Sequence, residues 1–348
     1  MKTKMTEMCG IKYPIMLAAM AYVSLPKLVA AVSNAGGLGM FNSAANTPKE
    51  MRDIIKEIKS LTDKPFGVNA TLLIPNSKEN MEVALEEKVP VLNYSLGKGD
   101  WIIKAAHGYG GKVLATVAMA RHAKRAEQDG ADGLIVTGYE AAAHGEEPTS
   151  LVLIPYIASL VNIPVMAAGG FSDGKGLAAA LVLGAEGISM GTRFYLSKEC
   201  ESHEAGKQAA LKATVMDTFR SAKIDGLLGR FLISPAALKM DQRKMIPLGK
   251  AISGVFEASR TTGTPLFKLL ISSLKQRQRG VQDLARQAIN LTAIKIAVET
   301  GDLEHEGVLP LGQIGGRIEN ILTCKEIIEG TVAEAEAIIK ATGKRFSS

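Results

Sequence analysis

Eight short apolar runs, separated by segments with helical periodicity, occupy the first 190 or so residues of this chain of 348. Rich in Val, Ile, Leu and Ala, they have the length and composition of buried strands. They are Pro14–Met20, Leu38–Phe41, Pro65–Leu73, Val89–Tyr94, Lys112–Val117, Gly133–Thr137, Pro164–Ala168 and Gly187–Met190. Their spacing of roughly 20 to 30 residues predicts an α/β fold, a TIM (β/α)8 barrel. A doubly wound sheet fits less well, because no GxGxxG follows the first strand.

The segments between these runs predict the outer helices of the barrel. Thr47, Pro48 and Glu50 form a typical helix start, with a capping box and a proline in the first turn. The predicted helices are Leu25–Asn34, Pro48–Leu61, Glu79–Glu87, Asp100–His107, Ala120–Gln128, Ser150–Val161 and Gly174–Leu183.

The pattern changes after the eighth strand. Helical periodicity continues without a clear strand, which predicts a helical subdomain at residues 204–309, inserted after a barrel at residues 1–203. Its candidate helices are Leu232–Leu238, Leu248–Ala258, Pro265–Leu274 and Val281–Val298. Residues 310–348 are expected to return to the barrel and to end in its eighth outer helix, Thr323–Thr342.

Composition narrows the class of protein. The apolar fraction of 47% and the charged fraction of 22% are those of a soluble globular protein. The net charge of +6 comes without a basic stripe interleaved with aromatic residues, so we expect no nucleic-acid partner. No apolar stretch is long enough to cross a membrane. Three widely separated cysteines support neither a metal site nor a disulfide framework, and a cytoplasmic location is expected.

Two neighbouring strands end in small residues. Gly169 and Gly170 follow the seventh strand, and Gly191 and Thr192 follow the eighth. Backbone N–H groups without a nearby Cβ can approach an anion closely, and the loops after strands seven and eight of a β/α barrel often bind phosphate. His144 follows the sixth strand beside this predicted phosphate site. The arrangement predicts a cofactor phosphate site opposite an acid/base residue.

Five stretches together resemble the nitronate monooxygenase family of flavin enzymes. They are PIMLAAMAYVSLPKLVAAVSNAGGLG, KPFGVNATLL, GYEAAAHG, PVMAAGGFSDGKGLAAALVLGAEGISMGTRF and IENILTCKEIIEGTVAEAE. Enoyl-ACP reductase II and an NADH:quinone reductase subgroup belong to the same superfamily. The similarity covers the barrel and the last helix, and is much weaker in the inserted segment.

The resemblance implies a barrel that binds FMN without a covalent link. The implied cofactor-binding residues are Ala18, Ala19, Met20, Asn69, Gly169, Gly170, Gly191 and Thr192, and the implied catalytic residue is His144. Glu140 is a candidate for orienting His144, or is a solvated loop carboxylate. The chain departs from the family at Leu17, where a glutamine is usual, and at Ala142 and Ala143, where glycines are usual.

The expected activity is oxidation of alkyl nitronates with O2 to a carbonyl compound and nitrite, with His144 as acid/base. The first alternative is a flavin reductase that takes electrons from NAD(P)H and acts on enoyl thioesters or quinones. The second is a non-catalytic flavin-binding protein. In each case the partner is a small molecule, no metal is expected, and the oligomeric state stays open, a homodimer being one option.

Overall fold

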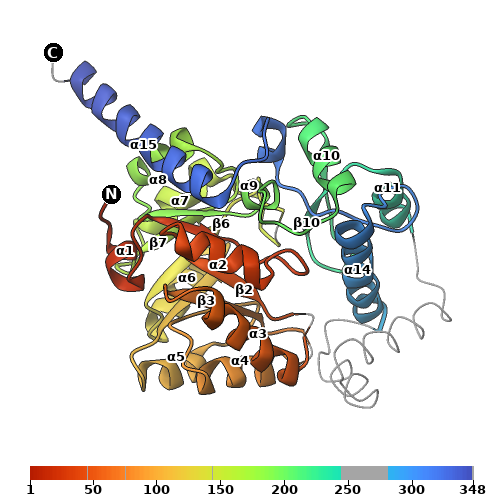
Figure 1. Cartoon of the computed structure of the whole chain (residues 1–348), viewed down its shortest axis with the longest axis horizontal. Helices are drawn as coiled ribbons and strands as arrows, with labels where there is room; N and C mark the ends of the chain where they lie inside the picture. Colours follow the sequence, from red (N-terminus) through yellow and green to blue (C-terminus); the bar gives the residue numbers. More distant parts are fainter. Residues whose placement is uncertain (45, 75, 143, 244–280, 347–348) are drawn as a thin grey trace.

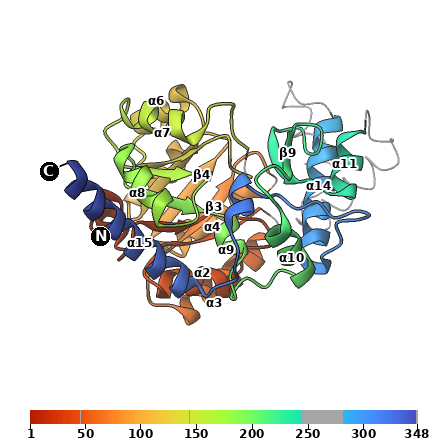
Figure 2. The same ribbon diagram turned by 90° about the horizontal axis from the view of Figure 1, so that it is seen from above.

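The computed structural model describes residues 1–44, 46–74, 76–142, 144–243 and 281–346. Eight parallel strands form a barrel with helices around it (Figures 1 and 2). They are β1 (Ile15–Leu17), β2 (Gly39–Asn42), β3 (Phe66–Thr71), β4 (Val91–Ser95), β5 (Lys112–Val117), β6 (Gly133–Thr137), β7 (Val165–Ala168) and β8 (Gly187–Met190). The predicted TIM barrel is confirmed, and each predicted strand overlaps an observed one.

The strands pair in the order β1–β8–β7–β6–β5–β4–β3–β2. The two ends of this order meet where Met16 forms a parallel bridge with Leu38. At that point the Leu17 N–H donates to the Leu38 carbonyl, and the Leu38 N–H donates to the Ile15 carbonyl, both at 2.9 Å. Because all the strands run the same way round the barrel, their carboxyl ends meet at one face, where such barrels carry their sites.

Outer helices follow the strands. They are α2 (Pro26–Asn34), α3 (Pro48–Leu61), α4 (Ser77–Glu86), α5 (Asp100–His107), α6 (Ala120–Gln128), α7 (Ser150–Ala158) and α8 (Gly174–Val182). The last helix, α15 (Cys324–Phe346), packs along α8 and α2, as Figure 1 shows. Gly174 permits this contact, because a Cβ there would lie 2.5 Å from the Ala335 nitrogen. None of the helices in the described ranges combines the length and the apolar character of a membrane-spanning helix.

The N-terminal helix α1 (Lys4–Cys9) closes the amino-terminal end of the barrel. The Thr3 hydroxyl donates to the Glu186 carbonyl at 2.7 Å, just before β8. Met5 and Cys9 are buried and pack against inward-facing barrel side chains, among them Met40, Leu114 and Met166. The amino-terminal end of the barrel is therefore filled by apolar side chains.

The inserted region, residues 204–309, contains helices as predicted, α10 (Glu204–Lys212), α11 (Pro235–Asp241) and α14 (Val281–Thr300). The prediction that it has no strand is wrong, because β9 (Thr218–Ser221) and β10 (Gly229–Leu232) form an antiparallel hairpin. The helix predicted at 232–238 also begins later, since Leu232 ends β10 and Ser234 caps α11. The helices predicted at 248–258 and 265–274 lie outside the described residues. The domain boundaries stay a prediction.

Candidate active site

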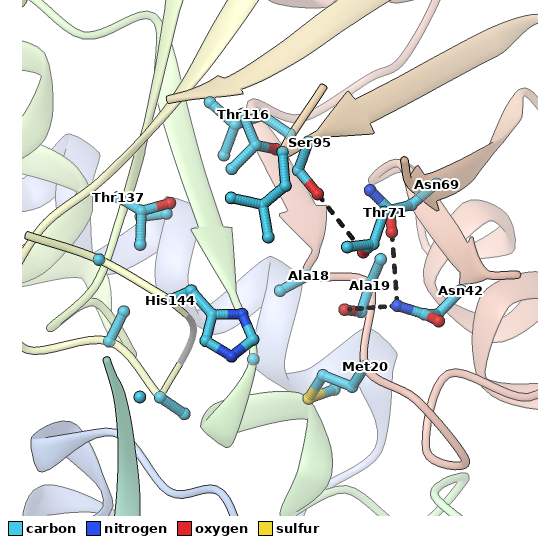
Figure 3. Close-up of a pocket in the computed structure, with 18 of the residues that line it drawn as sticks. Ala18, Ala19, Met20, Asn42, Asn69, Thr71, Ser95, Thr116, Thr137 and His144 are labelled. Carbon is cyan, nitrogen blue, oxygen red and sulfur yellow. Dashed lines mark hydrogen bonds between the residues drawn. The ribbon is translucent and has the colours of Figure 1, made fainter. Parts of the chain in front are cut away.

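The carboxyl ends of the barrel strands open into a cavity of about 900 Å³ with mostly apolar walls. All nine predicted site residues line it, namely Ala18, Ala19, Met20, Asn69, His144, Gly169, Gly170, Gly191 and Thr192. Figure 3 shows His144 on one side of this space and the Ala18–Met20 segment and Asn69 on the other. The structure thus brings these residues together, while their roles toward a cofactor stay predictions.

The glycines after β7 and β8 expose their backbone at the wall of the cavity. Gly169 and Gly170 have φ angles of 95° and 83°, which residues with a side chain rarely adopt. Gly191 caps the short helix α9 (Thr192–Tyr195), so Thr192, predicted as a helix N-cap, is instead its first residue. Within the described residues, the backbone N–H groups of Gly170 and Gly191 have no hydrogen-bond acceptor. They are available to an anion in the cavity.

This arrangement fits the phosphate of FMN. The Thr192 hydroxyl accepts the Gly312 N–H at 3.2 Å and can still donate its own hydrogen. Glu140 lies beside Gly170, but its carboxylate accepts the Ser150 N–H at 2.9 Å and the Ser150 hydroxyl at 2.8 Å. This carboxylate lies at the start of α7, where the positive end of the helix dipole stabilises its negative charge. Its hydrogen bonds with Ser150 hold it there.

The segment after β1 also suits a flat ring. The Ser24 hydroxyl donates to the Ala18 carbonyl and accepts the Met20 N–H, both at 3.0 Å, which fixes this loop. Ala18 and Ala19 carry only methyl groups, so a planar ligand can approach the backbone. A Cβ on Gly191 would lie 3.4 Å from the Met20 sulfur. The ends of β1 and β8 therefore form one continuous wall.

A row of polar side chains crosses the barrel mouth beneath this wall. Asn42 donates to the Ala19 carbonyl at 3.3 Å and to Asn69 at 3.4 Å. Asn69 donates to Asn93 at 2.5 Å, and Asn93 donates to Thr116 at 3.0 Å. Figure 3 shows the first part of this row. Of these asparagines only Asn69 was predicted from the sequence, although each of three consecutive strands carries one and this recurrence could have revealed all three.

His144 lies in the loop after β6, and its side chain is 37% exposed. Its Nε2 atom lies 2.7 Å from Oδ2 of Asp225, a side chain that is only 5% exposed and comes from the β9–β10 connection. Neither role considered for Glu140 is observed, because that carboxylate caps α7 instead. Asp225 was missed, and its distance of 81 residues from His144 along the chain leaves no local pattern to find it by.

The β9–β10 hairpin holds the loop of His144 at three further points. The Arg230 N–H donates to the Ala142 carbonyl at 3.2 Å, and its guanidinium donates to the Tyr139 carbonyl at 2.9 Å. The Arg220 guanidinium donates to the Gly145 carbonyl. Both guanidinium groups lie over the Tyr139 ring, at 4.6 and 4.5 Å from its centroid. Burial lowers the pKa of Arg230.

Comparison with known proteins places this architecture in a family. A family model described as nitronate monooxygenase matches residues 2–334. A relative from Rhodococcus jostii RHA1, (3aS,4S,5R,7aS)-5-hydroxy-7a-methyl-1-oxo-octahydro-1H-indene-4-carboxyl-CoA dehydrogenase, is 35% identical over 99% of this chain and 98% of its own. A probable nitronate monooxygenase from Staphylococcus aureus is 31% identical over 66% of this chain and 78% of its own.

A solved structure agrees with these relatives. FabK from Thermotoga maritima superposes with a TM-score of 0.81, is 34% identical, and covers 99% of each chain. The similarity therefore includes the inserted region as well as the barrel. The chain belongs to the nitronate monooxygenase family of oxidoreductase enzymes.

Proposed function

We propose that this protein is an FMN-dependent oxidoreductase of acyl thioesters, with His144 exchanging a proton at the carbon next to the thioester carbonyl. One observation carries the proposal: His144 and a phosphate-sized cradle of glycines line the same large, mainly apolar cavity. At about 900 Å³ the cavity is near the upper end of the usual range for ligand pockets. It leaves room for an apolar acyl group beside a flavin.

Different residues that line the cavity would bind the phosphate, the flavin ring and the acyl chain. Gly170, Gly191 and Thr192 would bind the FMN phosphate, and the Ala18–Met20 segment would lie along the ring. A bound flavin supplies the two-electron chemistry. The apolar side chains Leu291, Ile294 and Val298 of α14 line the cavity and would exclude water from the acyl chain. The imidazole of His144 can give or take a proton near neutral pH.

The relatives support a thioester substrate. The Rhodococcus protein that matches over nearly the whole length is named for a carboxyl-CoA substrate, and a Mycobacterium tuberculosis relative of the same name is 32% identical. FabK from Thermotoga maritima also matches over nearly the whole length. We infer that the inserted region, which these proteins share with the chain, belongs to the thioester site.

Oxidation of alkyl nitronates is the second candidate. The family model and the Staphylococcus relatives favour it by name. His144 would then take the proton from the carbon that bears the nitro group of a neutral nitroalkane. Nothing else in the cavity would need to change, because a nitronate is smaller than an acyl thioester.

The test is anaerobic. The purified protein, with FMN confirmed by its spectrum, is mixed separately with NADH, NADPH, a saturated acyl-CoA and propyl-2-nitronate. We expect a nicotinamide or the acyl-CoA to bleach the flavin, and an enoyl-CoA to reoxidise the bleached enzyme. If only propyl-2-nitronate changes the spectrum, the thioester proposal is wrong and the second candidate holds.

A further inference from the structure

The carboxylate of Asp225 lies at the centre of a small buried network beside His144. Its Oδ2 atom is 2.7 Å from Nε2 of His144 and 3.2 Å from Nδ2 of Asn290, on α14. Its Oδ1 atom accepts the Leu227 N–H at 2.9 Å. Every neighbour with an assigned role is a donor, so the network suits an acceptor-only carboxylate.

This network decides which ring nitrogen of His144 carries the proton. A carboxylate can only accept, so Nε2 must be the protonated nitrogen in the neutral ring. The other nitrogen, Nδ1, has no partner among the described residues. Its lone pair is therefore the one available to a substrate in the cavity.

We propose that Asp225 is the positioning residue of the active site, holding His144 in the Nε2–H tautomer with Nδ1 free for proton transfer. The inference rests on the proposed function for its catalytic meaning, and on geometry alone for the tautomer. It gives the inserted region a defined task, because Asp225 and Asn290 both come from that region while His144 comes from the barrel.

Asn290 supports this assignment. It is 5% exposed and lines the cavity. Because Asp225 only accepts, the amide nitrogen of Asn290 must face it, which leaves Oδ1 of Asn290 on the other side. That oxygen has no partner among the described residues. The amide can therefore turn over without losing another hydrogen bond if the group facing it changes from an acceptor to a donor.

The variant Asp225→Asn therefore tests directly whether residue 225 sets the tautomer of His144. The new amide can place its NH2 group where Oδ2 stands, and Asn290 can turn to accept from it. The NH2 group would then donate to Nε2 of His144, which moves the ring proton to Nδ1 and removes the base from the cavity. The change is nearly isosteric, so the fold of the hairpin should persist.

The first measurement is the ¹⁵N spectrum of histidine side chains in the holoenzyme. The chain has five histidines, and a His144→Gln sample identifies the signals of His144 by difference. We expect Nε2–H in the wild type and Nδ1–H in Asp225→Asn. The matched control is Asp217→Asn, because the Asp217 side chain hydrogen-bonds to the backbone and the side chain of Thr214 and is not among the residues that line the cavity. A wild-type Nδ1–H ring, or an unchanged ring in Asp225→Asn, overturns the proposal.

The second measurement is turnover of the thioester. We expect kcat of Asp225→Asn to fall by on the order of 10²-fold, with KM within a few fold and FMN content unchanged, because the loss falls on proton transfer. If Asp225→Asn does not fold, Asp225→Ser takes its place, with a mixture of tautomers expected. Normal kcat in a folded variant overturns the proposal. If the wild type turns over no thioester but the tautomer switches as stated, the proposed function fails and the positioning role stands.

Discussion

The barrel and the inserted region contribute to the active site in different ways. The barrel acts through backbone and short side chains at its strand ends, as at Gly170, Gly191 and the asparagine row. The inserted region acts through side chains that reach across to the barrel, chiefly Asp225 and Arg230. The loop of His144 is shared by the two parts, since it follows a barrel strand and the hairpin hydrogen-bonds to it.

This difference concerns two properties of the enzyme, flavin binding and turnover per bound flavin. Closure of the barrel sets the positions of the strand ends, so changes there should alter flavin binding. The hairpin contacts the loop of His144 rather than the glycines, so changes there should alter turnover with the flavin still bound. Flavin binding and turnover should therefore be separable by mutation.

The largest effect is expected at the residue that both regions share. His144→Ala removes the acid/base group, so turnover should fall by about 10²- to 10⁴-fold while FMN content stays unchanged. Turnover per bound flavin measures this directly. His305→Ala is the control, because His305 is exposed in the 302–306 turn and is not among the residues that line the cavity. Turnover within tenfold of wild type in His144→Ala would show that the proton is handled by another group.

A smaller loss of turnover is expected from the hairpin. Arg230→Met keeps the length of the side chain but removes its hydrogen bonds to Tyr139 and Thr218. A shift of the His144 loop by about 1 Å can cost roughly 10²-fold in rate. The free energy of unfolding should change less than turnover does, because burial disfavours the charged guanidinium of Arg230 and lowers its pKa.

The matched control for this hairpin variant is Arg52→Met. Arg52 pairs with Glu86 and Glu87 on the outside of the barrel. Thermal melting and turnover per bound flavin are measured on both variants. Loss of flavin from Arg230→Met with normal turnover in the molecules that retain it would remove the distinction between the two regions.

The barrel could be predicted from the sequence because its elements are local and repeated. The helices Asp100–His107 and Ala120–Gln128 and the strands Lys112–Val117 and Gly133–Thr137 coincide with their predictions residue for residue. Apolar runs ending in glycine or asparagine carry this information within a few residues. The glycine pair at 169–170 could be located at the end of its strand for the same reason, and its phosphate-binding role stays a prediction.

The inserted region could not be predicted to the same degree. Strands β9 and β10 have four residues each, too few for a clear alternation of apolar and polar side chains. Arg230 lies in the second of them and is buried, which composition would not indicate. Asp225, the hydrogen-bond partner of His144, lies in the connection of this hairpin and could not be found without predicting the hairpin. The contact between Asp225 and His144 forms only in the tertiary structure, so no local sequence pattern predicts it.

Flavin binding should be the property that responds to the glycines of the barrel. In Gly191→Ala the new methyl group would lie in ordinary contact, 3.4 Å from the Met20 sulfur, so the apoprotein should keep its stability. The methyl group would project beside the Ala18–Met20 wall, 3.6 Å from the Ala18 Cβ, and take up space next to the Gly191 backbone where the ligand is proposed to bind. We expect FMN to bind about tenfold more weakly, a change of about 1.4 kcal/mol, measured by titration of the apoprotein.

The control for this glycine is Gly330→Ala in α15, where a Cβ would meet nothing within 4 Å. It should stabilise that helix by up to about 1 kcal/mol and leave FMN affinity unchanged. Equal FMN affinity in Gly191→Ala and wild type would mean that the phosphate lies elsewhere in the cavity.

The smallest effect concerns the closed end of the barrel, away from both binding and turnover. Burial raises the pKa of Cys9 from its ordinary value of 9.0 to about 12. Below pH 9 the thiol is protonated in both states. Above it the unfolded chain loses a proton that the folded chain keeps, so the free energy of unfolding falls as pH rises toward 12. From pH 9 to 10 the loss is about 1 kcal/mol.

Cys9→Ala should remove this part of the alkaline slope, which urea denaturation at pH 8, 9 and 10 can measure. Tyr94 and Tyr109, whose pKa values burial raises to about 12, keep a similar slope in both proteins at higher pH. Turnover of Cys9→Ala at pH 8 should equal that of the wild type, because Cys9 packs in the closed amino-terminal end of the barrel and does not line the cavity. A change in turnover would show that the closed end of the barrel transmits strain to the strand ends, so that the barrel as well as the hairpin would control the position of His144.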